Sequence, residues 1–230
     1  MFTENKLRRA AANNGFNLDF EFIATTVQTN DTTTRTFSSN GLGTEHPERM
    51  IVVSITWGAA ASRTLNSASI NGVSATIVAD ISGTGGGTAI VYAKVPTGTS
   101  GDYVFSFSGA TLAARITKYA FNTTATTALD SGTASNPVTT ITLTTADIEC
   151  TIGGVVIATR FGSGSFTCTG SWTGPDSVVE TAESNTEGDT YWHGYVLSTQ
   201  NNSTHDFATT TSSSTTVPTM SCASFEYTVV

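Results

Sequence analysis

The chain has 230 residues, of which 38% are hydrophobic and 12% charged, and its formal net charge is −8. A chain of this length can bury a sizeable core, but its charged share is about half of the usual ~25%. From Tyr119 onward Arg160 is the only basic residue against ten acidic ones, so no basic stripe is available to neutralise phosphates, and nucleic acid is excluded as a partner.

Threonine makes up about a fifth of the sequence. Its β-branched side chain favours a pleated strand, and its hydroxyl can face water. The composition therefore predicts an all-β protein with a neutral, hydroxyl-rich surface. No stretch is long and apolar enough to span a membrane, and the N-terminus lacks the apolar core of a signal peptide. We expect no membrane insertion.

The first element is an exception, since TENKLRRAAANNG (Thr3–Gly15) has the pattern of a short helix. Thr3 can cap its N-terminus, and Gly15 supplies the left-handed residue that ends many helices. A helix of about ten residues with a small apolar face is marginal on its own. We therefore expect residues 1–18 to be a helical arm that docks on a neighbouring subunit, with docking on its own sandwich as the alternative. The anchoring residues of this arm would be Phe2, Lys6, Leu7, Arg8 and Arg9.

The rest of the chain repeats itself at a shift of about 104 residues. The segment IVVSITWG (51–58) matches VVIATRFG (155–162), and TAIVYAKV (88–95) matches TYWHGYVL (190–197). Between them, SINGVSATIVAD (69–80) has a counterpart in SWTGPDSVVETA (171–182). The identity is low, but strands and turns follow in the same order. The sequence therefore contains two pseudo-repeats, at about 19–121 and 122–230.

Each of these segments alternates with a period of two, as half-buried strands do. Ile51, Val53, Ile55 and Trp57 would share one face. Turn signals recur about every 8–14 residues, which is the spacing of a sandwich or jelly roll. One repeat alone would leave an apolar sheet face uncovered, so we expect its twin to cover it. The prediction is a single jelly-roll-like antiparallel β-sandwich over residues 19–230, with about a dozen strands.

Three stretches, SINGVSATIVAD, AKVPTGTSGDYVFSFSG and GGVVIATRFGSGSFTCTGSWTG, resemble a β-sandwich module of virion proteins from tailed bacteriophages and phage-like gene transfer agents. The resemblance covers roughly residues 45–228 and consists of turn and core patterns. It implies a structural, non-enzymatic role as a capsid decoration, collar or tail accessory, or fibre. It also implies other virion proteins as partners, a homo-oligomeric state, and location on the particle after assembly in the host cytoplasm.

Chemical motifs do not point to an enzyme. The sequence contains no nucleophile elbow, Walker loop, H-E-x-x-H motif or dinucleotide fingerprint. His46, His193 and His205 lie far apart, without a second ligand at metal spacing. The acidic segment Asp176–Asp189 is typical of a solvated loop, although its carboxylates could also ligate Ca²⁺. We predict no catalytic residue, no cofactor and no metal site.

One surface candidate lies in the segment YWHGY. Tyr191, His193 and Tyr195 fall on one strand face, and Trp192 falls on the other. If Trp192 points inward, the Tyr-His-Tyr stripe faces outward, where flat aromatic rings can stack on sugars or anchor a protein interface. The stripe supports an alternative function, a carbohydrate-binding adhesin that binds a host surface glycan. Ordinary cross-strand packing is the other interpretation.

Three cysteines, Cys150, Cys168 and Cys222, leave at least one thiol without a partner in the same chain. A free buried thiol is one interpretation. An inter-subunit disulfide is the other, because the phage resemblance implies release into a lysate that has no reducing pool.

Overall fold

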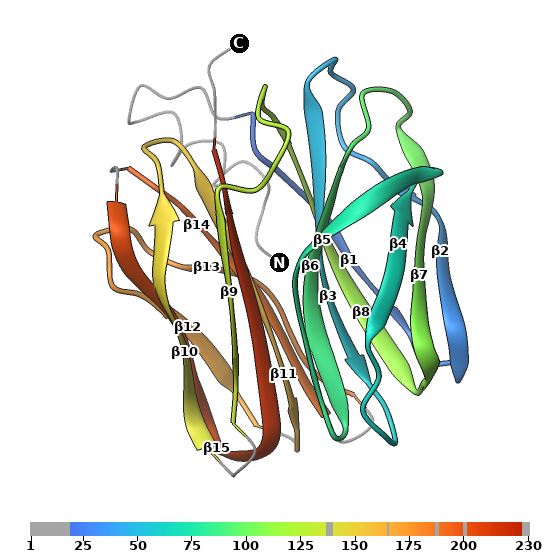
Figure 1. Ribbon diagram of the computed structural model, residues 1–230, viewed down its shortest axis with the longest axis vertical. Coiled ribbons are helices and arrows are strands. Elements are labelled where there is room, and N and C mark those ends of the chain that lie inside the picture. The colour runs from blue at the N-terminus through green and yellow to red at the C-terminus, as the bar shows by residue number, and fades with distance from the viewer. Residues whose placement is uncertain (1–18, 137–139, 165, 187–188, 200–201, 227–230) are drawn as a thin grey trace.

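The computed structural model describes residues 19–136, 140–164, 166–186, 189–199 and 202–226. In this part the chain forms fifteen strands and no helix. The strands of the first repeat, blue to green in Figure 1, lie beside those of the second repeat, yellow to red. The expected helical arm at residues 1–18, with Phe2, Lys6, Leu7, Arg8 and Arg9, lies outside the described residues.

The first repeat is a complete eight-stranded jelly roll. One sheet has the order β1-β8-β3-β6-β5, and the other has the order β5-β4-β7-β2. The strand β5 belongs to both, because its first residues pair with β4 and its later ones with β6. The strands are β1 (Glu21–Gln28), β2 (Thr32–Gly41), β3 (Arg49–Gly58), β4 (Leu65–Ile70), β5 (Val73–Gly83), β6 (Gly86–Lys94), β7 (Ser100–Thr111) and β8 (Ala113–Asn122).

The second repeat follows the same order. Its strands are β9 (Asp130–Ser135), β10 (Thr140–Cys150), β11 (Val155–Ser163), β12 (Cys168–Trp172), β13 (Val179–Thr186), β14 (Asp189–Leu197) and β15 (Asn202–Phe225). The long β15 takes the positions in the second repeat that β7 and β8 occupy in the first. Its first half lies between β10 and β12, and its second half lies between β9 and β11.

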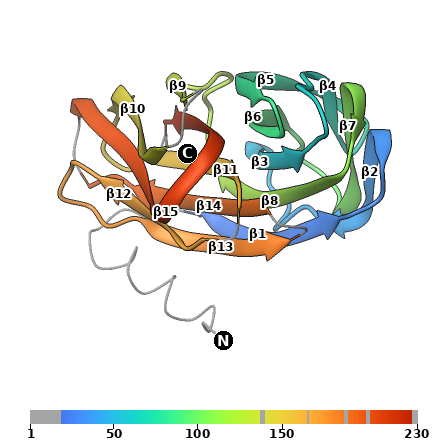
Figure 2. The same ribbon diagram turned by 90° about the horizontal axis from the view of Figure 1, so that it is seen from below.

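The two jelly rolls therefore make four layers, which lie next to one another in Figures 1 and 2. We call the sheets that face each other the inner sheets: β1-β8-β3-β6-β5 in the first repeat, and β9-β15-β11-β14-β13, with the second half of β15, in the second. The outer sheets are β2-β7-β4, continuing into the start of β5, and β10-β15-β12, with the first half of β15.

Hydrophobic residues fill the three spaces between the four layers. Ile51, Val53, Ile55 and Trp57 point into the first jelly roll, as the alternation predicts, and pack on residues of the outer sheet such as Phe105. A second core fills the second jelly roll. The third core lies between the inner sheets and defines the inter-repeat interface. Its members include Met50, Val52, Tyr92, Tyr119, Val155, Ile157, Tyr195 and Phe225.

This arrangement explains why every residue of β3 is buried. An inner strand is covered on one face by its own outer sheet and on the other by the second repeat, so both sets of alternating side chains leave water. The prediction of an all-β, jelly-roll-like sandwich built from two repeats is confirmed. The structure adds that each repeat closes two sheets of its own before it packs on its twin.

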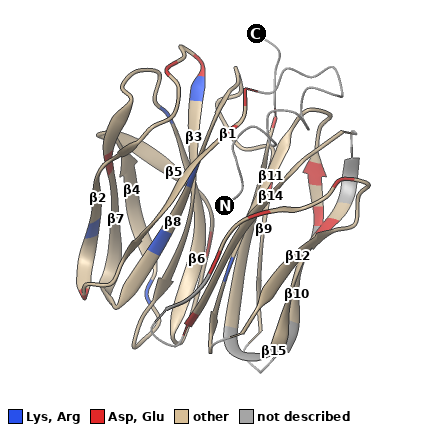
Figure 3. Cartoon of the chain, turned by 180° about the vertical axis from the view of Figure 1, so that it is seen from behind, with Lys and Arg blue, Asp and Glu red and all other residues tan. Residues whose placement is uncertain are grey.

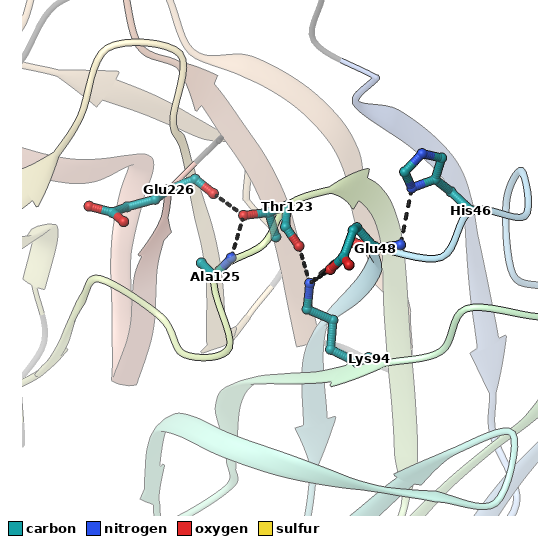
Figure 4. A network of polar contacts seen from close by, with 6 residues as sticks. All are labelled: His46, Glu48, Lys94, Thr123, Ala125 and Glu226. Atoms are coloured by element: carbon teal, nitrogen blue, oxygen red, sulfur yellow. Dashed lines mark hydrogen bonds and ion pairs between the residues drawn. The ribbon is translucent and has the colours of Figure 1, made fainter. Parts of the chain in front are cut away.

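A polar network ties the linker between the repeats to both of them (Figure 4). The Lys94 ammonium donates to the backbone carbonyl oxygens of Glu48 and Thr123 and lies 3.5 Å from the Glu48 carboxylate. The Thr123 hydroxyl donates to the carbonyl of Glu226 over 2.9 Å and accepts from the N–H of Ala125. The start of the linker is thus bonded to the loop before β3 and to the residue after β15.

Candidate functional site

The predicted outward stripe of Tyr191, His193 and Tyr195 is wrong, because all three side chains are buried, at 2%, 0% and 1% exposure. Trp192 does point into its own jelly roll, as expected. The opposite face of β14, however, is covered by the first repeat. There the Tyr195 ring packs on Phe20 with a centroid distance of 4.6 Å.

At the centre of the inter-repeat interface, His193 is hydrogen-bonded to hydroxyl groups on both sides. Its Nδ1 lies 2.7 Å from the Ser54 Oγ and 3.0 Å from the Thr159 Oγ1, and its Nε2 lies 3.4 Å from the Thr56 Oγ1. Desolvation, helped by the nearby Arg115 cation, holds the pKa of His193 well below its usual 6.5. The ring is therefore neutral and joins β3 to β14.

A serine hydroxyl beside an imidazole has the composition of a nucleophile and its base. Ser54 and His193 are both 0% exposed and lie between two closed sheets, so no substrate can reach the serine oxygen. The interface is continued by the Thr88 and Ser221 hydroxyls, 2.9 Å apart, and by the contact of the Tyr119 hydroxyl with Thr181. The geometry assigns this network to holding the repeats together.

The three cysteines are free and buried in the core of the second jelly roll. Burial raises the pKa of the Cys150 thiol to about 11 and that of the Cys168 thiol to about 12, and it also raises the pKa of Cys222. A buried, protonated thiol is a poor nucleophile and cannot meet a thiol of another subunit. The predicted inter-subunit disulfide is therefore wrong for this folded state, and the free buried thiol is correct.

Charge is distributed unevenly in the described residues. Sixteen acidic side chains occur there against seven basic ones. Five of the seven basic side chains are buried, and the ribbon in Figure 3 shows few charged positions on the strands. The buried cations contact mainly neutral oxygens. Arg49, for example, donates to the carbonyl oxygens of Gly43, Val95, Thr97 and Gly98.

Sequence reasoning missed these buried cations. Arg115 and Lys118 stand in the segment AARITKYAF, which otherwise has the composition of a core strand. A basic residue within such a segment is the signal that could have identified them, because a buried cation must find specific partners. Arg115 faces the second repeat, with its guanidinium 5.5 Å from the centre of the Tyr191 ring, whereas Lys118 faces the interior of the first jelly roll.

The outer face of the second outer sheet is lined by hydroxyl groups. Thr142 of β10 lies opposite Thr210 of β15, which in turn lies opposite Thr169 of β12. Exposed hydroxyl side chains come from three neighbouring strands, at Thr142, Thr144, Thr169, Ser171, Thr210 and Ser212, and the carboxylates of Asp147 and Glu149 are exposed towards the end of β10. Hydroxyls of this kind can donate and accept at once, so the face can pair with a wide range of polar surfaces.

The first outer sheet is also rich in hydroxyl groups, and its face includes Val104 and the exposed Asp102 of β7. Thr34 on β2 lies opposite Ser106 on β7, which lies opposite Ser67 on β4. Thr36 and Ser74 are exposed on the same outer face. The two outer faces, at opposite sides of the double jelly roll, are therefore the candidate functional surfaces.

A shallow depression of about 600 Å³ opens at one end of the first jelly roll, between the carboxylates of Glu21 and Glu45. Both carboxylates are already engaged, since Glu21 accepts from the N–H of Thr44 and Glu45 accepts from that of Gly98. The two carboxylates at the depression therefore hold the surrounding loops in place, and we do not assign a ligand site there.

Within the described ranges no group of three or more His, Cys, Asp or Glu side chains could hold a metal ion. His46 accepts the N–H of Glu48, and the ring of His205 lies edge-on to Trp172. Among the described residues, no helix has the length and apolar character that a membrane crossing requires.

No protein-family model matches this chain, and no curated protein sequence is similar to it. Among solved structures, a crystal structure of Cucumber Necrosis Virus is similar, with a TM-score of 0.30 and 10% sequence identity. The match covers 93% of this chain and 88% of that one. A similarity of this size identifies neither a shared family nor a shared function.

Proposed function

We propose that this protein is a non-enzymatic structural protein of a virion, attached to the particle as a decoration, collar or tail accessory. The observation that carries the proposal is the pair of outer faces rich in hydroxyl groups. The hydroxyl-rich parts of such a face can contact another protein without stripping water from charges, which is the costly step in burying polar surface. Neighbours of this kind would be other virion proteins or further copies of this chain.

The interior of the molecule supports the same role. His193, the three thiols and five cations are all committed to packing and hydrogen bonds within the described part. Contacts with partners would therefore be made by the outer surface of the molecule and not by these buried groups. The resemblance of the turn and core patterns to virion proteins of tailed phages points to the same class of function.

Residues 1–18 serve in this proposal as the anchor to the particle. Lys6, Arg8 and Arg9 stand there against the single acidic residue Glu4, while the described body has more than twice as many acidic as basic residues. A basic segment is attracted to an acidic neighbour, which favours correctly oriented encounter. The double jelly roll would then project from the surface of the particle.

The experiment compares the full chain with a chain that lacks residues 2–15, each produced together with the particles and purified with them by density gradient. We expect both chains to show the same unfolding transition, and only the full chain to be found on the particles by antibody labelling in the electron microscope. Equal incorporation of the shortened chain would contradict the role of the arm. Absence of the full chain from intact particles would contradict the virion function.

A glycan-binding adhesin is the alternative from sequence, but the stripe that suggested it is buried between the repeats. Specific binding of the full chain to a glycan array would be the outcome that favours it.

A further inference from the structure

Three strands of the first jelly roll bring an amine and a carboxamide together. The Lys118 Nζ on β8 lies 2.5 Å from the Asn40 Oδ1 on β2, and the Lys118 side chain is only 1% exposed. Because a carbonyl bond is about 1.23 Å long, the Asn40 Cγ lies at most about 3.7 Å from the amine nitrogen. That limit is close to the separation of about 3–3.5 Å at which bound groups react.

A bulge in β2 turns Asn40 towards the amine. Phe37 is buried and points inward, so regular alternation would turn Asn40, three residues later, outward. The register with β7 shifts between Phe37, opposite Tyr103, and Asn40, opposite Gly101, and Ser39 takes a left-handed φ of 54°. The extra residue places the Asn40 side chain on the inner face. A strained conformation of this kind is typical of functional positions.

Lys118 is buried among neutral groups. Its Nζ donates to the Thr26 Oγ1 over 2.7 Å and to Asn40, and it lies 5.7 Å from the centre of the Tyr103 ring. Its contacts in the described part include no carboxylate. Desolvation consequently lowers the pKa of Lys118 to about 8, so about a tenth of the amine is neutral and nucleophilic at pH 7.

Thr26 completes the arrangement. Its hydroxyl accepts from the Lys118 Nζ and donates to the Asn40 Oδ1 over 2.7 Å. One hydroxyl can therefore take a proton from the attacking amine while it passes its own proton to the carboxamide oxygen. The Asn40 Nδ2 donates to the carbonyl of Ser38 at the exposed side of the strand, from which a leaving group can depart into water.

We propose that Lys118 and Asn40 condense to an isopeptide bond with release of ammonia. The neutral amine attacks Cγ, and the Thr26 relay gives a tetrahedral intermediate with a protonated oxygen. As the intermediate collapses, that proton goes to the leaving nitrogen, the C–N bond to the former Nδ2 breaks, and the C=O bond forms again. The products are a secondary amide and one ammonia, without any oxidant or co-reactant.

The bond would join an outer sheet to an inner sheet. β2 is the edge strand of the outer sheet, and β8 lies in the inner sheet beside β1. The two residues are 78 positions apart in the chain, so the bond would close a loop that contains most of the first jelly roll.

Intact-mass spectrometry of the purified full chain tests the proposal. We expect a mass lower by one ammonia than the sequence requires, and a cross-linked peptide that contains both Lys118 and Asn40. The variants Lys118→Arg and Asn40→Ala should each have the full mass that their sequences require. If one of the two variants does not fold, the other still tests the proposal. The matched control Lys94→Arg, which changes a lysine of the neighbouring network, should keep the deficit.

Another reaction also releases ammonia, since Asn40-Gly41 and Asn71-Gly72 can cyclise to a succinimide without any lysine. A deficit that persists in Lys118→Arg would come from that reaction and would overturn the proposal. The chain with the native sequence is also incubated for a long time at about pH 9, where the Lys118 amine is mostly neutral. If this chain still has the full mass that its sequence requires, the proposal is overturned as well.

Discussion

Replacing His193 by glutamine tests how the inter-repeat interface responds to acid. In the folded protein the pKa of His193 is held well below 6.5 by desolvation, whereas in the unfolded chain it returns to about 6.5. As the pH falls below about 6.5, His193 is therefore protonated in the unfolded chain but stays neutral in the folded chain. Because a depressed histidine pKa gives stability above the unfolded pKa, that stability is lost as the pH falls below about 6.5.

The size of the effect follows from this proton. Between pH 7 and pH 5.5, protonation of an unfolded histidine lowers the free energy of the unfolded state by about 1.3 kcal/mol, as long as the folded ring stays neutral. Asp80 titrates in the same window, because desolvation raises the pKa of its carboxyl to about 6. The folded state takes up that proton first, so the contribution of Asp80 has the opposite sign. More than a third of the Asp80 side chain still contacts solvent, which screens this effect, so the contribution of Asp80 is the smaller one.

Urea unfolding at the two pH values, followed by tryptophan fluorescence, measures the difference. Glutamine does not titrate, and it can still hydrogen-bond to the Ser54 and Thr159 hydroxyls. We expect the native chain to lose about 1.3 kcal/mol more than His193→Gln between pH 7 and pH 5.5. Both the native chain and His193→Gln contain Asp80, so its contribution cancels in the difference between their losses. Equal losses in the native chain and His193→Gln would refute the assignment of a buried neutral imidazole.

Two further predictions concern close packing and the thiols. Gly86→Ala should destabilise the fold by about 1–3 kcal/mol in urea unfolding, because a Cβ there would lie 2.2 Å from the Trp57 carbonyl oxygen and 2.5 Å from the Phe161 ring of the other repeat. Thr84→Ala, at an exposed position of the turn just before β6, is the control, and equal stability of the two variants would contradict the reasoning. The cysteine thiols of the native protein should not react with a disulfide reagent at pH 8 and should all react after unfolding, since burial raises their pKa values. Rapid reaction of even one native thiol would show that the second core opens to solvent. The residues concerned are Cys150, Cys168 and Cys222.

The strands and the repeat could be predicted from sequence because they leave local signals. Ile51, Val53, Ile55 and Trp57 share a core face, as their alternation indicates. Alternation does not say how many sheets a repeat closes, however. β5 and β15 each bend and serve two sheets, and no residue pattern marks that division.

The error at Tyr191, His193 and Tyr195 has a related cause. A period of two identifies which side chains share a face, but it does not identify what covers that face. The informative signal was on the facing strand β3, whose second face has Met50, Val52 and Ser54 and no charge. An uncharged second face indicates a strand covered on both sides. The pairing of Lys118 with Asn40 was equally hidden, because it depends on a bulge in β2 that only the register reveals.

The linker after Asn122 has a consequence for how the protein behaves on dilution. Two separate jelly rolls that met through their inner sheets would form a dimer, and a dimer loses stability as its concentration falls. Here residues 123–129 connect β8 to β9 within one chain, so each inner sheet always finds its partner at a fixed high effective concentration. The four-layered unit therefore stays whole at any dilution, and each half can change its outer surface independently of the other.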